Sequence, residues 1–295
     1  MTKVSDVYGD RVSAAYDQVV RIVGADFSAP LKPILDYQLK GMRQSKGFRP
    51  ALVFAAAEAS GCNFASSELV NRAACVHLLH EVTLMLDDVF DRSRTRRGRL
   101  ATHCKFGRNY TISAALWAKE LITRAYVEDR RVARALNECS LALLDGEARQ
   151  WRMRTGSRPI AIDQWERVAQ GDTTALFVLA ASLGQLDSHT YVDVIGRTYH
   201  GIDDLHDLLD IEQLGGGGSE DIRDRVPTLL ACFCSGFTYQ DLFSAVPCAI
   251  SYLQHELTRR RPPSNHPLEP FFLDLDNWLT AAVSKFADMQ PGRVR

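Results

Sequence analysis

The chain has 295 residues, of which 46% are hydrophobic and 24% are charged, and its formal net charge is −1. These values are typical of a globular protein and provide no general electrostatic attraction to nucleic acid or to a membrane surface. No apolar stretch approaches the roughly 20 residues that a bilayer span requires, and the N-terminal segment lacks the apolar run of a signal peptide. We therefore expect a cytoplasmic protein without stable membrane insertion.

Most long segments have the three- and four-residue apolar spacing of helices. In chain order, the clearest are residues 49–61, 66–91, 133–151, 173–184, 191–210 and 268–287. Alternating strand patterns are nearly missing, and no shift in composition marks a domain boundary. The GGGGS run at 215–219 follows no strand and precedes no GK[ST] sequence, so it predicts a loop and not a phosphate-binding loop. The sequence predicts a single all-α domain over residues 1–295.

Seven cysteines are scattered along the chain. Their odd number and irregular spacing argue against a disulfide framework and favour reduced thiols. Cys232 and Cys234 are too close in sequence for the usual CxxC pattern of zinc sites, so we expect them to pack in the core.

Two acidic clusters with the same DDxxD spacing lie near the C-terminal ends of predicted helices. Their members are Asp87, Asp88 and Asp91 in the first cluster and Asp203, Asp204 and Asp207 in the second. Like charges on one helix face, at the end where the helix dipole is negative, are unfavourable unless cations offset them. A single cluster is compatible with a solvated helix end, whereas a matched pair of oxygen ligands favours magnesium and a phosphate-bearing substrate.

The segment from Lys46 to about Thr228 resembles the trans-isoprenyl diphosphate synthases, also called polyprenyl synthetases. HEVTLMLDDVFDRSRTRRGRLATHCKFG resembles the first aspartate-rich region of that family with its RRG, and YHGIDDLHD resembles the second. SKGFRP is similar to the GKRLRP segment, and GDTTALF is similar to the KTAALF segment. The resemblance implies an isoprenoid-synthase-type bundle of mostly antiparallel helices around a central cavity, usually in a homodimer.

The resemblance also implies a reaction and its participants. A Mg²⁺-dependent prenyltransferase of this family condenses an allylic prenyl diphosphate with isopentenyl diphosphate to a longer trans-prenyl diphosphate. The six aspartates would be catalytic and would bind the metal ions. The acceptor diphosphate would be bound by Lys46, Arg49, His80 and Arg97.

Further substrate-binding residues follow from the same resemblance. Arg96 would face the allylic diphosphate. Thr173 lies in the segment similar to KTAALF, and His200 stands where the family usually has glutamine. The remaining arginines of the RSRTRRGR run have no assigned role, and we expect them to be exposed; they are Arg92, Arg94 and Arg99. A nucleic-acid patch is the competing interpretation of this run, but the neighbouring acids and the neutral chain oppose it.

The chain departs from the family pattern at three lysine positions around the allylic diphosphate. Asp172, Gly216 and Val226 stand in their place. Because each charge-assisted contact is worth roughly 1.5–3 kcal/mol, we expect donor binding to be weakened or rearranged. The acceptor residues and both clusters are kept, which favours coupling of two substrates. The alternatives are a terpene synthase that cyclises a prenyl diphosphate and a non-catalytic partner subunit.

Product length is predicted from the residues that precede the first cluster. Val82 and Thr83 are small, so they would not block a growing chain, and Trp117 on the next helix is a candidate for a deeper floor. The absence of bulk at these positions predicts a product of more than about fifteen carbons, and we expect about twenty.

Overall fold

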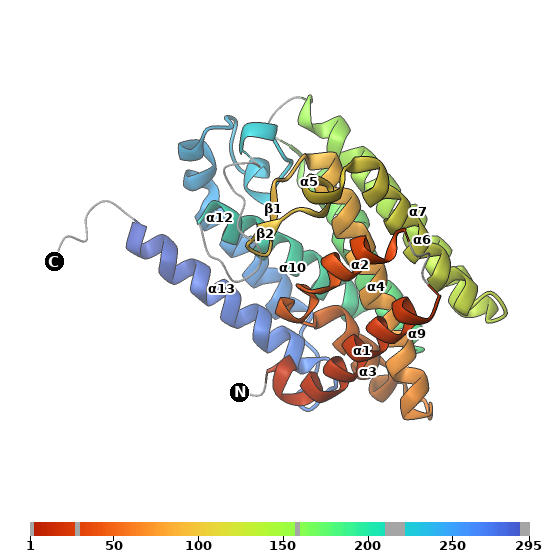
Figure 1. The fold of residues 1–295 in the computed structure, drawn as a ribbon. Coiled ribbons are helices and arrows are strands. Elements are labelled where there is room, and N and C mark those ends of the chain that lie inside the picture. The colour runs from red at the N-terminus through yellow and green to blue at the C-terminus, as the bar shows by residue number, and fades with distance from the viewer. Residues whose placement is uncertain (1–2, 27–29, 157–159, 210–221, 290–295) are drawn as a thin grey trace. The chain divides into compact units, whose positions relative to one another are not determined.

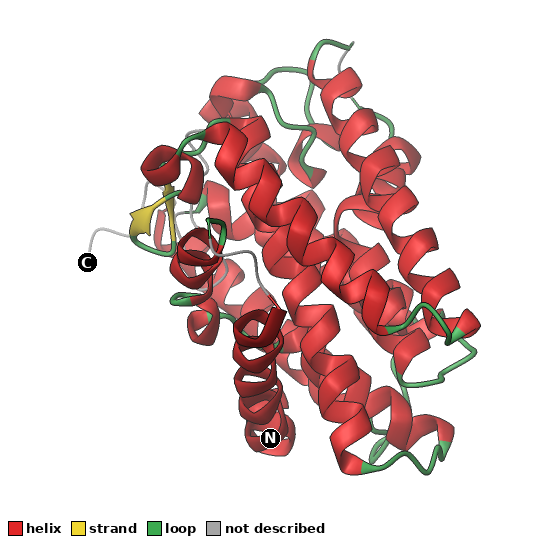
Figure 2. Ribbon diagram, turned by 45° about the vertical axis from the view of Figure 1, so that its right-hand side comes forward, coloured by secondary structure: helices red, strands yellow, loops and turns green. Residues whose placement is uncertain are grey.

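The computed structural model describes residues 3–26, 30–156, 160–209 and 222–289. Helices account for most of these residues, and two short strands form a β-hairpin within them (Figures 1 and 2). The predicted all-α fold class is confirmed. The GGGGS run, with Gly216, lies outside the described residues.

The chain divides into two compact units. The N-terminal unit contains Val4–Asn137 and Leu179–Asp187, and the C-terminal unit contains Glu138–Val178 and Ser188–Arg295 with Met1–Lys3. The sequence carries no signal of this division, and the assignment of one domain over 1–295 stays a prediction. No helix in the described residues combines the length and the apolar character that a membrane span requires.

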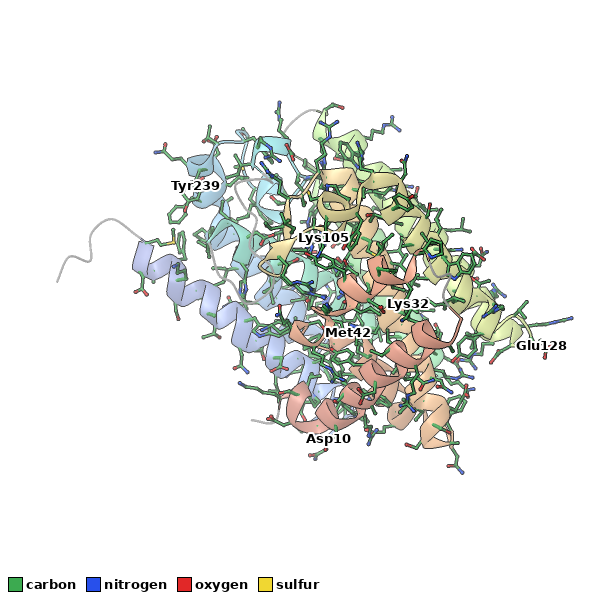
Figure 3. All side chains as sticks on the ribbon, viewed as in Figure 1. Asp10, Lys32, Met42, Lys105, Glu128 and Tyr239 are labelled. Atoms are coloured by element: carbon green, nitrogen blue, oxygen red, sulfur yellow. The ribbon has the colours of Figure 1, made fainter. Side chains whose placement is uncertain are left out.

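Helices of the N-terminal unit surround α4. The unit contains α1 (Val4–Asp26), α2 (Lys32–Leu39), the 3-10 helix η1 (Met42–Gln44), α3 (Phe48–Ser60), α4 (Ser66–Asp91), β1 (Thr95–Arg96), β2 (Arg99–Leu100), α5 (Thr102–Phe106), α6 (Arg108–Ala125), the start of α7 (Arg130–Arg154) and the end of α9 (Ala175–Leu183). Helix α4 packs against α1, α3 and α6 and buries most of its apolar residues from Ala73 to Met85. Met42 on η1, labelled in Figure 3, is also buried.

Helix α4 ends where the first acidic cluster ends. Arg92 adopts the left-handed conformation (φ 58°), and its backbone N–H donates to the carbonyl oxygen of Asp88. A left-handed residue of this kind closes a helix and turns the chain away. The cluster therefore occupies the last turns of α4, as the spacing predicts.

The hairpin that follows α4 is formed by the TRRGRL sequence. β1 and β2 pair antiparallel, with Arg96 opposite Arg99. Arg97 (φ 52°) and Gly98 (φ 69°) form the two-residue loop between them. Positive φ at both loop residues is the pattern of a type I′ turn, which suits the twist of paired strands and favours glycine at its second position. The RRG motif is thus a tight hairpin turn that fixes three arginines in a small space.

The C-terminal unit is organised around α10. It contains most of α7, α8 (Ile162–Ala169), the π-helix η2 (Gln170–Thr174), the start of α9, α10 (Thr190–Leu208), the 3-10 helix η3 (Leu229–Cys232), α12 (Tyr239–Arg259) and α13 (Glu269–Met289). Helix α10 packs against α8, η2, α12 and α13. π-helical turns are rare and often occur at functional sites. This one contains Asp172 and Thr173, both singled out in the sequence.

Candidate active site

The first acidic cluster contains one buried carboxylate. Asp88 Oδ1 accepts hydrogen bonds from Arg96 Nε at 3.0 Å and Nη2 at 2.6 Å. The other oxygen, Oδ2, is buried and has no hydrogen-bond partner in the described residues. Burial raises the pKa of Asp88 above its usual 3.8, and the neighbouring Arg96 opposes this shift. Asp87 and Asp91 are half-buried.

A carboxylate oxygen that is buried without a donor fits a cation ligand. No three His, Cys, Asp or Glu side chains among the described residues are arranged to hold a metal ion between them. Magnesium does not need such a cage, because it usually takes one or two protein carboxylates together with substrate phosphate oxygens and water. The donor set at Asp88 is therefore compatible with magnesium.

The N-terminal unit brings together three of the four predicted acceptor-binding residues. Arg49 Nη1 lies 3.4 Å from His80 Nε2. Burial lowers the pKa of His80 well below its usual 6.5, and the charges of Arg49 and Arg97 lower it further. His80 is therefore neutral at pH 7, which limits charge repulsion in the cluster. Lys46 is exposed.

Sequence reasoning missed the acid that holds Arg97. Glu81 on α4 is fully buried, and its carboxylate accepts from Arg97 Nη2 at 2.9 Å and Nη1 at 3.3 Å. Gln38 Nε2 donates to the same carboxylate at 2.9 Å, and His77 Nε2 lies 3.5 Å away. A charged residue on the apolar stripe of α4, directly after His80, was the signal that could have identified it. Glu81 positions the Arg97 guanidinium.

One assignment in the arginine run is wrong. Arg92 and Arg94 are exposed as expected, but Arg99 is half-buried. Its Nη1 donates to the carbonyl oxygen of Tyr37 at 3.1 Å, and its guanidinium lies 4.1 Å from the centre of the Tyr37 ring. The hairpin turn explains the difference, because it directs the chain after Gly98 back toward α2.

The second acidic cluster occupies the last turns of α10, and all three aspartates are half-buried. Asp204 Oδ2 accepts from the indole Nε1 of Trp165 at 3.1 Å and from the backbone N–H of Leu229 at 2.7 Å. These two donors, from α8 and from the start of η3, fix the Asp204 carboxylate. Because Asp87 and Asp203 lie in different units, their convergence on one substrate stays a prediction.

Two predicted substrate-binding residues of the C-terminal unit contact each other. Thr173 Oγ1 lies 2.8 Å from His200 Nδ1, a hydrogen bond between η2 and α10. The His200 ring also packs against Trp165, with ring centres 5.7 Å apart. Thr173 is buried and His200 is half-buried. The π-helical turn thus places Thr173 beside the helix that carries the second cluster.

Asp172 stands at one of the three positions where the resemblance implies a lysine, and its carboxylate is hydrogen-bonded. Asp172 on η2 is half-buried and accepts a hydrogen bond from Gln150 Nε2 on α7 at 3.1 Å. A Cβ on Gly146 or on Gly171 would meet the backbone of the other below 3 Å, so α7 and η2 approach closely here. Val226 is half-buried and carries no charge.

Comparison with protein families gives a match over most of the chain. The model of the polyprenyl synthetase family matches residues 29–241. Octaprenyl diphosphate synthase of Escherichia coli (strain K12) is 30% identical over 200 residues, which cover 62% of this chain and 60% of that protein. Geranylgeranyl diphosphate synthase of Methanosarcina mazei is 29% identical over 202 residues, which cover 63% of this chain and 62% of that protein. The chain thus spans about three fifths of the length of these curated relatives.

Solved structures show the same fold. A decaprenyl diphosphate synthase from Rhodobacter capsulatus matches with a TM-score of 0.72, at 19% identity, over 96% of this chain and 98% of that one. At this identity the likeness concerns the fold alone.

Proposed function

This chain belongs to the polyprenyl synthetase family, and from that premise we propose that it is a magnesium-dependent prenyltransferase. It condenses an allylic prenyl diphosphate with isopentenyl diphosphate to a longer trans-prenyl diphosphate. One observation carries the proposal. In a single unit, the cations Arg49 and Arg97 and neutral His80 accompany Asp88, one of whose carboxylate oxygens is buried and receives no hydrogen bond from the part of the chain that the structure describes.

The acceptor diphosphate is bound by cationic and neutral donors of the N-terminal unit. Arginine binds phosphate through paired, charge-assisted hydrogen bonds, which suits Arg49 and Arg97 to this task. His80 is neutral and adds a ring nitrogen without adding charge. Lys46 supplies a further positive charge from the exposed turn before α3.

The aspartates would hold the metal ions. Asp87, Asp88 and Asp91 from α4 and Asp203, Asp204 and Asp207 from α10 are the proposed ligands. Bound magnesium would neutralise the charge that develops on the departing diphosphate. Arg96 donates a hydrogen bond to Asp88 and so holds its carboxylate in place. In addition to the metal ions, the Arg96 guanidinium would provide a positive charge that faces the allylic diphosphate.

Product length and assembly are parts of the same proposal. Val82 is buried and Thr83 half-buried on α4, and both are small, which supports a product of about twenty carbons. Trp117 on α6 is 42% exposed, and its role as a deeper floor stays a prediction. Tyr110 and Leu116 are other exposed apolar residues on α6, and their exposure supports a homodimer.

A product assay tests the proposed reaction. Purified protein is incubated with magnesium, labelled isopentenyl diphosphate and each allylic diphosphate in turn, and products are separated by chain length. Longer labelled diphosphates are the expected result. Unlabelled hydrocarbons or alcohols formed without isopentenyl diphosphate would indicate a terpene synthase, and absence of turnover would indicate a non-catalytic subunit.

A further inference from the structure

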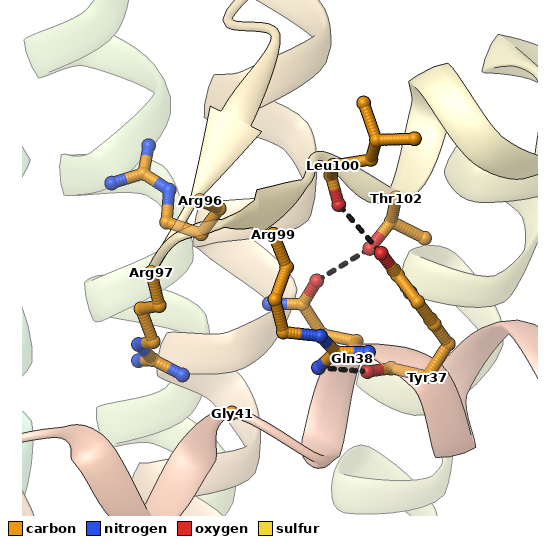
Figure 4. A pocket seen from close by; sticks show the side chains of 8 residues that line it. All are labelled: Tyr37, Gln38, Gly41, Arg96, Arg97, Arg99, Leu100 and Thr102. Atoms are coloured by element: carbon orange, nitrogen blue, oxygen red, sulfur yellow. Dashed lines mark hydrogen bonds between the residues drawn. The ribbon is translucent and has the colours of Figure 1, made fainter.

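A small pocket of the N-terminal unit is lined by the arginines of the hairpin (Figure 4). Its volume is about 260 Å³, part of it open to solvent. The lining includes Arg96, Arg97 and Arg99 from the hairpin and Tyr37, Gln38 and Gly41 from α2 and the turn after it. None of the residues on the α2 side was assigned a role from the sequence.

Two guanidinium groups converge at Gly41. Figure 4 shows the side chains of Arg97 and Arg99 extending toward Gly41, whereas Arg96 points away from it. A Cβ on Gly41 would lie 3.7 Å from Arg97 Nη1 and 3.8 Å from Arg99 Nη1. The backbone of Gly41 (φ −91°, ψ −7°) does not require glycine. What the glycine provides is open space between two positive charges.

The three arginines differ in how their charges are balanced. Arg96 is paired with Asp88, and Arg97 is paired with Glu81. Arg99 donates to a neutral carbonyl oxygen, and the described part of the chain places no carboxylate in contact with it. Lys105 adds a further positive charge, because its Nζ lies 4.1 Å from the centre of the Tyr37 ring that Arg99 also contacts. The pocket therefore has an excess of positive charge.

Two guanidinium groups as close together as those of Arg97 and Arg99 repel each other unless an anion lies between them. Arg96 and Arg99 stand opposite each other in the hairpin, an arrangement that destabilises paired strands when both residues carry the same charge. Arg97 adds backbone strain, since it has a positive φ without being glycine. The opposed arginines and the positive φ of Arg97 both lower the stability of the free protein. Such features are expected where a ligand binds.

We propose that Arg97, Arg99 and the open space at Gly41 form a cradle for the diphosphate group of the acceptor substrate. The inference rests on the proposed function and adds Arg99 as a diphosphate ligand. Two guanidinium forks that meet at one point can each donate paired hydrogen bonds to phosphate oxygens. Glu81 holds the Arg97 fork, and Tyr37 holds the Arg99 fork through its carbonyl oxygen and ring.

The test measures binding of inorganic pyrophosphate to the full-length protein by calorimetry, without magnesium and at fixed salt concentration. Arg99→Gln should weaken binding about tenfold, because one charge-assisted ligand is lost. Arg99→Lys keeps the charge and should lose less. Gly41→Ala should also weaken binding, because its methyl group fills the cradle. Arg94→Gln, which removes an exposed arginine of the same segment, is the matched control and should bind as the parent chain does.

Thermal unfolding separates binding from a purely structural role of Arg99 at Tyr37. The cradle is overturned if Arg99→Gln binds pyrophosphate as tightly as the parent, or if Arg94→Gln loses as much affinity. It is also overturned if Arg99→Lys loses as much as Arg99→Gln and both unfold at lower temperature.

Turnover assays then distinguish this inference from the proposed function. In an active protein, Arg99→Gln should raise KM for isopentenyl diphosphate and leave KM for the allylic substrate unchanged. Normal kinetics of Arg99→Gln would refute the cradle and leave the prenyltransferase function standing. Arg99-dependent binding of pyrophosphate by a protein without turnover would refute the function and leave Arg97 and Arg99 as a diphosphate-binding site.

Discussion

The two units carry acidic clusters of the same spacing in different surroundings. In the N-terminal unit, Asp88 pairs with a guanidinium, and further arginines lie in the same hairpin. In the C-terminal unit, one oxygen of Asp204 is held by two neutral donors. An acid, Asp172, occupies a position where the sequence resemblance implies a lysine, and it accepts a hydrogen bond from Gln150. The two units share the DDxxD motif, but a diphosphate would meet positive arginines in the N-terminal unit and a negative Asp172 in the C-terminal unit.

If the N-terminal arginines and His80 bind the acceptor, as we propose, this difference indicates which substrate interaction has been kept. An acceptor-binding cluster has no use in an enzyme that only ionises and cyclises one substrate. Its retention beside a loss of donor-side cations favours coupling of two molecules with altered donor recognition. Substitutions in either unit test this difference.

The largest effect is expected from removing a cluster aspartate. If both clusters bind metal ions at one leaving group, as we propose, Asp87→Ala and Asp203→Ala should each lower turnover about a thousandfold or more despite their different surroundings. Turnover is measured as labelled product, with circular dichroism to verify folding. A near-normal rate in either variant would show that the two clusters are not equivalent and would remove that carboxylate from the metal site.

Arg97→Ala should affect stability and binding through separate causes. The substitution leaves Glu81 buried without its cation, which costs about 3–5 kcal/mol of the free energy of unfolding. The double variant Glu81→Gln/Arg97→Ala removes the unpaired charge and should recover much of that stability. It should still show a raised KM for isopentenyl diphosphate. Denaturant unfolding and steady-state kinetics measure the two effects, and normal KM in the double variant would contradict the role of Arg97.

Sensitivity to acid is expected in the N-terminal unit. Burial lowers the pKa of His77 from 6.5 to about 4, whereas in the unfolded chain the ring titrates near 6.5. Between these values the unfolded state binds more protons, so stability is present above pH 6.5 and is lost as the pH falls toward 4. The loss amounts to about 3 kcal/mol.

The variant His77→Gln isolates this contribution. Its stability should fall less steeply than that of the parent chain between pH 6.5 and 4. The raised pKa of Asp88 acts in the opposite direction in both proteins and therefore cancels in the difference. Parallel stability curves, measured by denaturant unfolding at several pH values, would show that His77 does not titrate in this range.

The sequence predicted the elements that depend on local patterns. The apolar spacing of α4 and its terminal aspartates were predicted correctly, because helical periodicity and the residues that follow it are local properties. Glu81 and Arg99 were missed for the opposite reason. Their partners, Arg97 and Tyr37, are brought to them by the hairpin, and tertiary pairing leaves no regular spacing in the sequence.

Sequence patterns did not predict the π-helical turn η2 either. Residues 173–184 were predicted as a regular helix, but η2 inserts a wider turn over Gln170–Thr174. The close approach of Gly146 and Gly171 accompanies it, and such packing between distant segments cannot be read from periodicity. The resemblance predicts Thr173 and His200 as substrate-binding residues, but it does not predict their mutual hydrogen bond.

The smallest effect is expected from a substitution that gives the C-terminal unit a positive charge near its acidic cluster, as the N-terminal unit has. Asp172→Lys restores a positive charge in the C-terminal unit and should lower KM for the allylic diphosphate about tenfold, the value of one charge-assisted contact. KM for isopentenyl diphosphate should not change, because we propose that the N-terminal unit binds that substrate. Asp163→Lys, at an exposed aspartate of α8, makes the same change in net charge and should alter neither constant. An unchanged donor KM in Asp172→Lys would mean that this chain binds its donor without a cation at η2, and the contrast between the units would then reflect a different donor and not a weakened one.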